Sequence, residues 1–451
     1  MRILLTGATG LIGKKLGQAL VRAGHELLVV SRQADAQLFI PFPCEVIQGD
    51  LSRAALTDER LAKVEAVIHL AGENVGQNKW SPEVKKAILE SRTQGTKNLW
   101  KSLESAPLKV AVVASAIGFY GDLADEELSE TSNAGEGFLA QVSQEWEKAL
   151  LQHGFPNLRL CIIRLGVVLS EEGGALGKMI PLARKGLGAA LGNGQQWMSW
   201  IHIQDVVGLF SFALENEKLA GVVNAVAPNP VRNAEFSKAL SENTGTFLGP
   251  NVPRFALKLV LGEQAEMVLA SQRVSCARIL SLGYRFAFPE LNAAMASVCG
   301  YVKSGDELFV AEQYLDSPLE QVFPFFAEAK NLETITPPLV NFKIIGMSTP
   351  TIQKGSLIDY SLKIHGVPVK WRTDITTWDP PREFVDEQLK GPYSKWHHTH
   401  SFEKLGRGTL MRDRVLYRVP LGFLGALTTG WLVRKDVEEI FSFRRRAVAQ
   451  I

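Results

Sequence analysis

The chain has 451 residues, of which 46% are hydrophobic and 21% charged, and its formal net charge is +2. This length exceeds that of one ordinary domain, so we expect two or three domains, each with a buried core. A net charge so close to zero argues against a dedicated nucleic-acid-binding surface.

The four cysteines indicate a reducing compartment. They lie far apart and fit no metal-ligand spacing, at positions Cys44, Cys161, Cys276 and Cys299. Such thiols are typical of cytoplasmic proteins, and no signal peptide precedes the first predicted strand. The most membrane-like stretch, residues 420–433, spans about 14 residues, too few to cross a bilayer. We therefore expect a cytoplasmic protein without an integral membrane segment.

The first thirty residues carry the strongest pattern. Residues 2–5 form a short apolar run, typical of a buried parallel strand. Gly7, Gly10 and Gly13 follow at intervals of three. They suit a sharp turn, a close approach of a pyrophosphate, and close packing of the next helix, whose N-terminus favours an anion. The pattern predicts a dinucleotide site, the alternative being a glycine-rich turn without a ligand.

The second predicted strand, residues 26–30, indicates which dinucleotide is bound. It leads into Ser31 and Arg32, with no acidic residue at its tip. An acidic residue there would bind the ribose 2′-hydroxyl of NAD, whereas arginine favours the 2′-phosphate of NADP. We expect NADP(H) as the cofactor, with Ser31 and Arg32 beside the ribose. The alternative is that Arg32 is a solvated surface charge.

The spacing within TGATGLIG resembles that of the extended short-chain dehydrogenase/reductase group. In that group an acidic residue after the third strand commonly faces the adenine, and Asp50 is the candidate here, or else a turn residue. A fourth predicted strand, residues 66–70, ends in Ala71 and Gly72, whose small size lets the chain pass close to the cofactor. Further elements are predicted as a helix over 82–103, a strand over 110–113, a helix over 138–152 and a strand over 159–165. This alternation predicts an α/β, Rossmann-like, doubly wound parallel sheet.

The catalytic residues of the extended group are incomplete. The group carries a Ser or Thr after the fifth strand and a Tyr-x-x-x-Lys pair on the next helix. Ser115 fits the first, although one extra residue before Tyr120 leaves the register open, but Phe138 and Val142 stand where Tyr and Lys are expected. A positioned acid or base is worth about 10²–10⁴ in rate. We predict nucleotide binding without the usual chemistry, with Ser115 and Tyr120 as catalytic candidates; Tyr120 either donates a proton or packs against the substrate or core.

Other polar residues leave alternatives open. His202 lies in a WIHIQD stretch that resembles the substrate-side motif of the epimerase group, so it either contacts a substrate or is a hydrogen-bonded structural histidine. Glu145, Trp146 and Glu147 on the helix over 138–152 are expected to be structural.

Longer runs carry a more specific resemblance over residues 1 to about 298. They are LAGENVGQNKWSPEVKKAILESR, SAIGFYG, GGALGKMIPLARKGLGAALGNGQQWMSWIHIQD, NAVAPNPVRNAEF and GEQAEMVLASQRV. They resemble the atypical epimerase-like family of extended reductases, described as nucleoside-diphosphate-sugar epimerase-like, which ends in a small helical cap, here residues 250–298. The resemblance implies an NADP(H) site formed by Gly7, Thr9, Gly10, Leu11, Ile12, Arg32, Ala71, Gly72 and Ser115. It also implies that Arg164 and Gly166 lie near the nicotinamide.

A second domain is predicted over residues 307–451, after a linker over 299–306. Its predicted elements are a strand over 308–315, a helix from Pro318, alternating strands up to Arg418, and a last helix over 424–449. Alternation predicts an antiparallel sheet with one buried face. The order, with the runs LEQVFPFFAEAKNLETITPP, HGVPVKW and FVDEQLKGPYSKWHHTHSF, resembles START-like helix-grip domains of the polyketide-cyclase/dehydrase branch. This implies an α+β domain with an apolar cavity for a small hydrophobic ligand.

Two clusters in this domain are ambiguous. His398 and His400 fall on one face of their strand and His397 on the other. A histidine pair suggests a metal, but no third ligand accompanies it in the sequence, so we expect cavity lining or cross-strand pairing and no metal site. Residues 444–446 are three arginines that complement the dipole of the last helix, or else contact a membrane or partner.

Two functions follow from these patterns. In the first, an NADP(H)-dependent oxidoreductase or isomerase receives a lipophilic substrate from the fused domain. In the second, NADP(H) binds without turnover and the pair forms a nucleotide-gated binding module. A nucleotide-sugar substrate is a third, and the sequence leaves a homodimer open.

Overall fold

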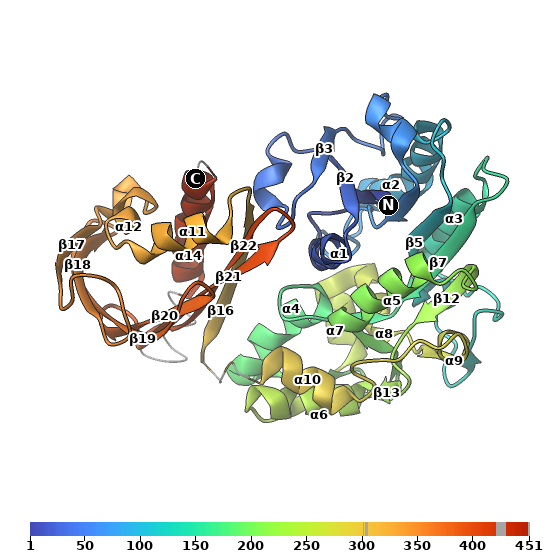
Figure 1. Cartoon of the computed structure of the whole chain (residues 1–451). Coiled ribbons are helices and arrows are strands. Elements are labelled where there is room, and N and C mark those ends of the chain that lie inside the picture. The colour runs from blue at the N-terminus through green and yellow to red at the C-terminus, as the bar shows by residue number, and fades with distance from the viewer. Residues whose placement is uncertain (301, 303–304, 421–429, 450–451) are drawn as a thin grey trace. The chain divides into compact units, whose positions relative to one another are not determined.

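The computed structural model describes residues 1–300, 302, 305–420 and 430–449. The chain forms two compact units, one of Met1–Ala36 with Cys44–Tyr301 and one of Gln37–Pro43 with Val302–Ile451 (Figure 1). The short segment Gln37–Pro43 thus groups with the second unit, whereas the sequence had placed it in the first domain.

The first unit is built around a seven-stranded parallel sheet (Figure 1). Its strands follow the order β12-β7-β5-β4-β1-β2-β3. Their bounds are β1 (Arg2–Thr6), β2 (Glu26–Ser31), β3 (Glu45–Gln48), β4 (Ala66–His69), β5 (Val110–Ala116), β7 (Arg159–Leu165) and β12 (Gly221–Ala225). The chain runs outward from β1 to β3 and then returns to β4 on the other side of β1. In such sheets a ligand binds at the carboxyl ends of the strands beside this switch point.

Helices cover both faces of this sheet. On one face α1 (Leu11–Arg22) packs beside α5 (Ile203–Glu215), and on the other α2 (Pro82–Ser102) packs beside α3 (Phe138–Leu151) (Figure 1). Because both faces are covered, the strand residues form nearly continuous buried runs. The predicted Rossmann-like fold is confirmed.

The remaining elements of the first unit are short. They are β6 (Glu127–Leu128), β8 (Val167–Leu169), α4 (Gly174–Leu182), β9 (Ala189–Leu191), β10 (Trp197–Met198), β11 (Trp200–His202), β13 (Val231–Arg232), α6 (Asn233–Thr244), β14 (Gly249–Val252), α7 (Arg254–Leu261), α8 (Glu266–Leu269), β15 (Arg273–Val274), α9 (Ala277–Ser281) and α10 (Leu291–Cys299). The region predicted as a helical cap holds α7 to α10. A second core beneath it joins α4, α6 and α10 around Trp200, Phe236 and Met295.

The second unit is an antiparallel sheet with helices. Its seven strands follow the order β16-β22-β21-β20-β19-β18-β17. Their bounds are β16 (Glu307–Leu315), β17 (Lys343–Met347), β18 (Leu357–Ile364), β19 (Val367–Asp379), β20 (Glu383–Lys390), β21 (Lys395–Leu405) and β22 (Gly408–Arg418). The helices are α11 (Leu319–Ala327), α12 (Asn331–Thr334) and α14 (Gly430–Val448). The predicted start of the last helix, residues 424–429, lies outside the described residues.

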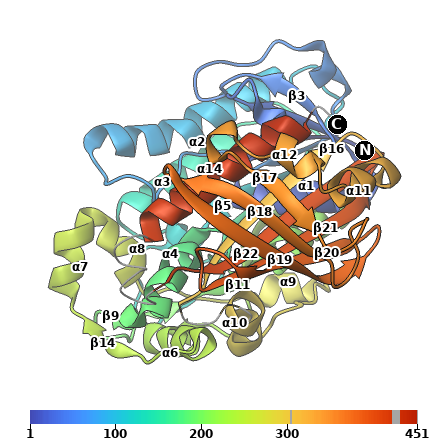
Figure 2. The ribbon, with the colours of Figure 1, turned by 90° about the vertical axis from the view of Figure 1, so that its left-hand side faces the viewer.

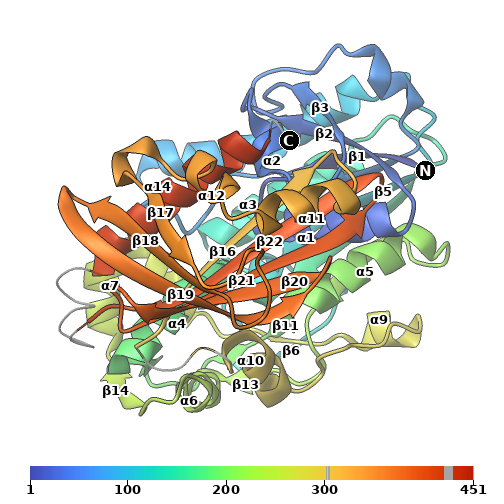
Figure 3. The same ribbon diagram turned by 60° about the vertical axis from the view of Figure 1, so that its left-hand side comes forward.

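The long helix α14 lies along one face of this sheet (Figures 2 and 3). Its Val437 and Phe441 pack on Val415 and Tyr417 of β22. The predicted helix-grip arrangement of an antiparallel sheet against a long last helix is confirmed. Within the described ranges, no helix combines the length and the apolar character that crossing a membrane requires.

Candidate functional sites

The glycine turn between β1 and α1 leaves no room for side chains. Gly7 has a φ of +73°, a conformation that favours glycine, and a Cβ there would lie 2.9 Å from the carbonyl carbon of Leu70. A Cβ at Gly13 would lie 2.2 Å from the Gly7 carbonyl oxygen, so α1 packs directly on the turn. Gly10 precedes α1, and no side chain caps the helix there. The first-turn N–H groups of α1 are therefore free to face an anion.

The other predicted cofactor residues lie around this turn. Thr9 is exposed, and Leu11 and Ile12 begin α1 half-buried. Arg32 follows β2, is exposed, and forms no hydrogen bond or ion pair with any described residue. The Ser31 hydroxyl beside it accepts a bond from the Gln33 amide at 3.2 Å. A positively charged side chain is thus available at the tip of β2.

Asp50 has the partners of a turn residue. Its Oδ1 accepts hydrogen bonds from the Ser52 amide and hydroxyl at 3.0 and 2.6 Å, and its Oδ2 lies 3.4 Å from Nε of Arg53. This is the turn that the sequence left as the alternative to an adenine contact. The carboxylate keeps 26% of its surface exposed.

A buried histidine that the sequence analysis did not single out joins the tips of β1 and β4. The Thr6 hydroxyl lies 2.7 Å from Nδ1 of His69 and accepts bonds from the amides of Leu70 and Ala71, each at 3.2 Å. Burial, assisted by the charge of Arg92, lowers the pKa of His69 to about 4. His69 is therefore neutral at pH 7 and fixes the chain where it enters Ala71 and Gly72.

A second buried polar cluster, Ser115, Tyr120, Glu147, Arg164 and Asn224, lies where the usual catalytic residues would be. Arg164 donates from Nε and Nη2 to the two oxygens of Glu147, at 2.8 and 2.7 Å. The Ser115 hydroxyl donates to the same carboxylate at 2.7 Å. Nη1 of Arg164 donates to the Tyr120 hydroxyl, which in turn donates to Asn224 Oδ1 at 2.7 Å.

Within this cluster, the two candidate catalytic hydroxyls are buried and cannot be reached by a substrate. Ser115 is 2% exposed, Tyr120 0% and Arg164 3%. Burial raises the pKa of Tyr120 above its usual value. The placement of Ser115 and Tyr120 thus speaks against their predicted catalytic role, because each hydroxyl proton already bonds within the protein. Arg164 is likewise occupied, because its guanidinium donates to Glu147 and Tyr120.

The two positions at which the sequence analysis placed the Tyr-Lys pair of the extended group are apolar and packed. Phe138 meets Trp80 edge-on with ring centroids 4.9 Å apart, and Val142 is 3% exposed. No acid or base therefore takes the place of the pair at these two positions.

His202 is held as a structural histidine, one of the two alternatives left by the sequence. Its Nδ1 accepts a bond from the Gln204 amide at 3.2 Å and so caps α5. The ring lies against Phe288 with centroids 3.9 Å apart. Burial lowers its pKa to about 4.

In the second unit, the strand register brings together polar residues that are distant in the sequence. Asp386 of β20 lies directly opposite His398 of β21, and Asp413 of β22 lies directly opposite His400. The sequence analysis expected no carboxylate near the histidines, and this premise was wrong. The missed signal is the pairing of three strands, which depends on both connecting turns.

A small pocket adjoins this cluster beneath α14. Its lining is formed by Ala311, Glu312, Gln313, Met411, Asp413, Phe441, Arg444 and Arg445. It has room for about one water molecule at most. Farther along the sheet, an aromatic cluster joins the buried Tyr360 and Trp371 to the partly buried Tyr393 and Trp396.

Comparisons with known proteins identify three regions. The NAD dependent epimerase/dehydratase family matches residues 3–225, a domain of unknown function (DUF1731) matches residues 252–298, and the polyketide cyclase / dehydrase and lipid transport family matches residues 315–441. A chloroplastic SDR39U1 homolog of Arabidopsis thaliana, an epimerase family protein, is 37% identical over 306 residues, which cover 66% of this chain and 86% of that protein. The chain belongs to the SDR39U1-like epimerase family.

Two further comparisons support this family assignment. An epimerase family protein of Mycobacterium leprae is 34% identical and is covered over 94% of its length, against 65% of this chain. The crystal structure of human SDR39U1 (isoform 2), solved with NADPH, is 34% identical and has a TM-score of 0.60. It covers 67% of this chain and is itself covered completely. The family resemblances drawn from the sequence are confirmed for both parts of the chain.

Proposed function

We propose that this SDR39U1-like protein binds NADP(H) at the tips of β1, β2 and β4 and exchanges hydride between it and a small lipophilic substrate. The observation that carries the proposal is the glycine turn, where a Cβ at Gly13 would overlap the Gly7 carbonyl oxygen and the start of α1 is uncapped. This cradle fits a pyrophosphate. The residues that would hold the nucleotide are Gly7, Thr9, Gly10, Leu11, Ile12, Gly13, Ser31, Arg32, Asp50, Ala71 and Gly72.

The choice of NADP(H) over NAD(H) rests on Arg32. Arg32 lies beside the end of β2 and has no partner among the described residues, so it can bind a 2′-phosphate. The tip of β2 carries no acidic residue that would repel the phosphate. The NADPH in the human SDR39U1 structure supports the same cofactor.

The proton of the reaction requires another source. Bound NADPH supplies a hydride, but the hydroxyls of Ser115 and Tyr120 donate to Glu147 and Asn224. We propose that this proton comes from water. Ser115 and Tyr120 then act as positioning residues that hold the ends of β5 and β7.

The lipophilic nature of the substrate rests on the second unit. Its family includes lipid transport in its description. In the aromatic cluster, Tyr393 and Trp396 are only partly buried and offer apolar surface for a ligand. The four free cysteines support a cytoplasmic location as part of this proposal. The Arabidopsis relative, by contrast, is named chloroplastic.

A second candidate is nucleotide binding without turnover. It is favoured by one observation, the absence of an accessible proton donor among Ser115, Tyr120, Phe138 and Val142. In that case NADP(H) acts as a signal that alters ligand binding.

Fluorescence titration of the full chain with NADPH and NADH tests the cofactor. We expect tight NADPH binding, weaker NADH binding, and loss of the preference in Arg32→Ala. Arg382→Ala, which removes an exposed arginine of the second unit, is the matched control and should bind as the wild type does. NADPH oxidation in the presence of lipophilic carbonyl compounds then separates the candidates, because binding without oxidation favours the second. Failure to bind either nucleotide would refute both.

A further inference from the structure

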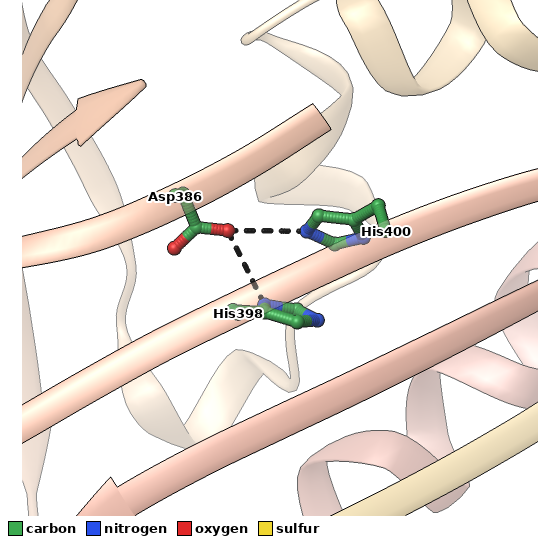
Figure 4. Close-up of side chains that lie close together, drawn as sticks. All are labelled: Asp386, His398 and His400. Atoms are coloured by element: carbon green, nitrogen blue, oxygen red, sulfur yellow. Dashed lines mark hydrogen bonds and ion pairs between the residues drawn. The ribbon is translucent and has the colours of Figure 1, made fainter. Parts of the chain in front are cut away.

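Two buried histidines of the second unit lie between two carboxylates. His398 and His400 are on one face of β21, with Asp386 of β20 on one side and Asp413 of β22 on the other. Figure 4 shows Asp386 directed at both rings from the neighbouring strand. The rings lie close together, with centroids 3.8 Å apart. Each ring therefore has one nitrogen toward each carboxylate.

The spacing on the Asp386 side matches that of metal ligands. Oδ2 of Asp386 lies 3.3 Å from Nδ1 of His398 and 3.2 Å from Nε2 of His400. Ligand atoms of the three side chains all lie within 4.8 Å of one another. Two bonds of about 2.1 Å at the tetrahedral angle separate ligand atoms by about 3.4 Å. The two distances from Asp386 are close to this value, so the three side chains can bind one divalent ion if the two imidazole nitrogens move toward it.

Asp413 supplies what metal-binding histidines usually have on the opposite nitrogen. Its Oδ1 lies 3.0 Å from Nε2 of His398 and 2.7 Å from Nδ1 of His400. Such carboxylates fix the tautomer and orientation of each ligating ring. Nδ1 of His400 is buried and has no hydrogen-bond partner, although Oδ1 of Asp413 lies 2.7 Å away. An ion bound at Nε2 would leave the proton of His400 on this nitrogen, facing Asp413.

The cluster is buried, and Asp386 is its most exposed side chain. The side chains of His398, His400 and Asp413 are 6%, 4% and 4% exposed, whereas Asp386 is 16% exposed. An ion can enter past Asp386. Phe384 stacks on His400 with centroids 4.2 Å apart, which keeps water away from the opposite face of that ring.

The positive charges near the cluster lie on the Asp413 side. Asp413 is buried, Nη1 of Arg444 of α14 lies 3.7 Å from its Oδ1, and Arg445 also interacts with it electrostatically. Half-buried Asp386 forms ion pairs, among the described residues, with His398 and His400 alone. A cation held beside Asp386 would offset the cost of removing its charge from water.

We propose that Asp386, His398 and His400 bind one Zn²⁺ ion, with Asp413 orienting both rings. Imidazole and carboxylate ligands in this number suit zinc, with a water or a ligand atom in the fourth position. The ion replaces protons on Nδ1 of His398 and Nε2 of His400, and the remaining N–H groups donate to Asp413. The site is independent of the NADP(H) site proposed for the first unit.

The test uses the full chain without an affinity tag, treated with a chelator and dialysed. Calorimetric titration with Zn²⁺, followed by elemental analysis after gel filtration, should give one ion per chain. His400→Gln and Asp386→Asn should abolish this binding, and Asp413→Asn should weaken it about 10–100-fold. His397→Gln is the matched control on the same strand. Its side chain lies on the opposite face, is 36% exposed and pairs with Glu387, so binding should be unchanged.

Substoichiometric binding by the wild type, or full binding by His400→Gln, would overturn the proposal. Circular dichroism shows whether each variant is folded. If a variant unfolds, X-ray absorption of the Zn²⁺-loaded wild type decides, because two imidazole nitrogens and one carboxylate oxygen are expected around the ion. A coordination shell without imidazole would reject the site.

Discussion

The buried pair of Glu147 and Arg164 is the feature of the first unit whose loss should cost most. The side chains are 9% and 4% exposed, and Glu147 accepts two hydrogen bonds from Arg164 and one from Ser115. Glu147→Gln keeps the shape and one acceptor oxygen but removes the negative charge. The guanidinium of Arg164 is then left buried without a counter-charge.

Removing one partner of a buried ion pair costs about 3–5 kcal/mol. Because glutamine retains one acceptor, we expect the lower end, about 3 kcal/mol. Arg164→Met should cost a similar amount, since it leaves a buried carboxylate. The double variant Glu147→Gln with Arg164→Met carries no buried charge at this pair, so it should lose less stability than the sum of the two single losses.

Hydrogen exchange measured by mass spectrometry gives the local free energy of opening for peptides of β5, α3 and β7. This readout avoids treating a chain of two units as a single two-state transition. Peptides of β18 and β19 in the second unit serve as the internal control and should not change. A loss below about 1 kcal/mol for Glu147→Gln, or strictly additive losses, would refute the reasoning, because exposed ion pairs behave in that way.

Three further outcomes follow from the structure. Gly13→Ala should abolish NADPH binding in the fluorescence titration, whereas Gly95→Ala, where a Cβ meets nothing within 4 Å, should not change it. The pKa of His69 should be about 4 by NMR. Because that lies below the unfolded value of about 6.5, the first unit should lose about 3 kcal/mol of stability as pH falls from 6.5 to 4, and His69→Gln should lessen that loss. Tyr120→Phe should cost about 1–3 kcal/mol by leaving Asn224 Oδ1 unpaired, yet leave any NADPH oxidation intact.

Helices and strands were predicted accurately where the sequence pattern that defines them lies in neighbouring residues. The strand over 159–165 and the first residue of the helix at Pro82 coincide with β7 and α2. The strand predicted over 110–113 is too short, because β5 continues through Ala114, Ser115 and Ala116. These small residues carry no strand signal of their own, and their pairing with Ile163, Arg164 and Leu165 of β7 extends the strand.

The polar clusters could not be predicted in the same way. The residues of the glycine turn are close together in the sequence, so its geometry could be predicted from the sequence. The partners of Glu147 and Arg164 come from α3 and β7, and their contact depends on how a helix packs on the sheet. Asp386 and His398 meet only because a tight connection sets the register of β20 and β21. A shift of one residue would turn these side chains to opposite faces.

The two buried clusters differ in their charge, and this difference separates a structural role from a binding role. Glu147 and Arg164 neutralise each other, and Ser115 and Tyr120 use their hydroxyl protons within the same cluster. The charges and hydroxyl protons of these four side chains are therefore all paired within the cluster. In the second unit the ion pairs of Asp386, among the described residues, are with His398 and His400 alone. Its negative charge therefore lies beside two further metal-ligand side chains, which is why we assign a metal ion to this cluster and none to the first.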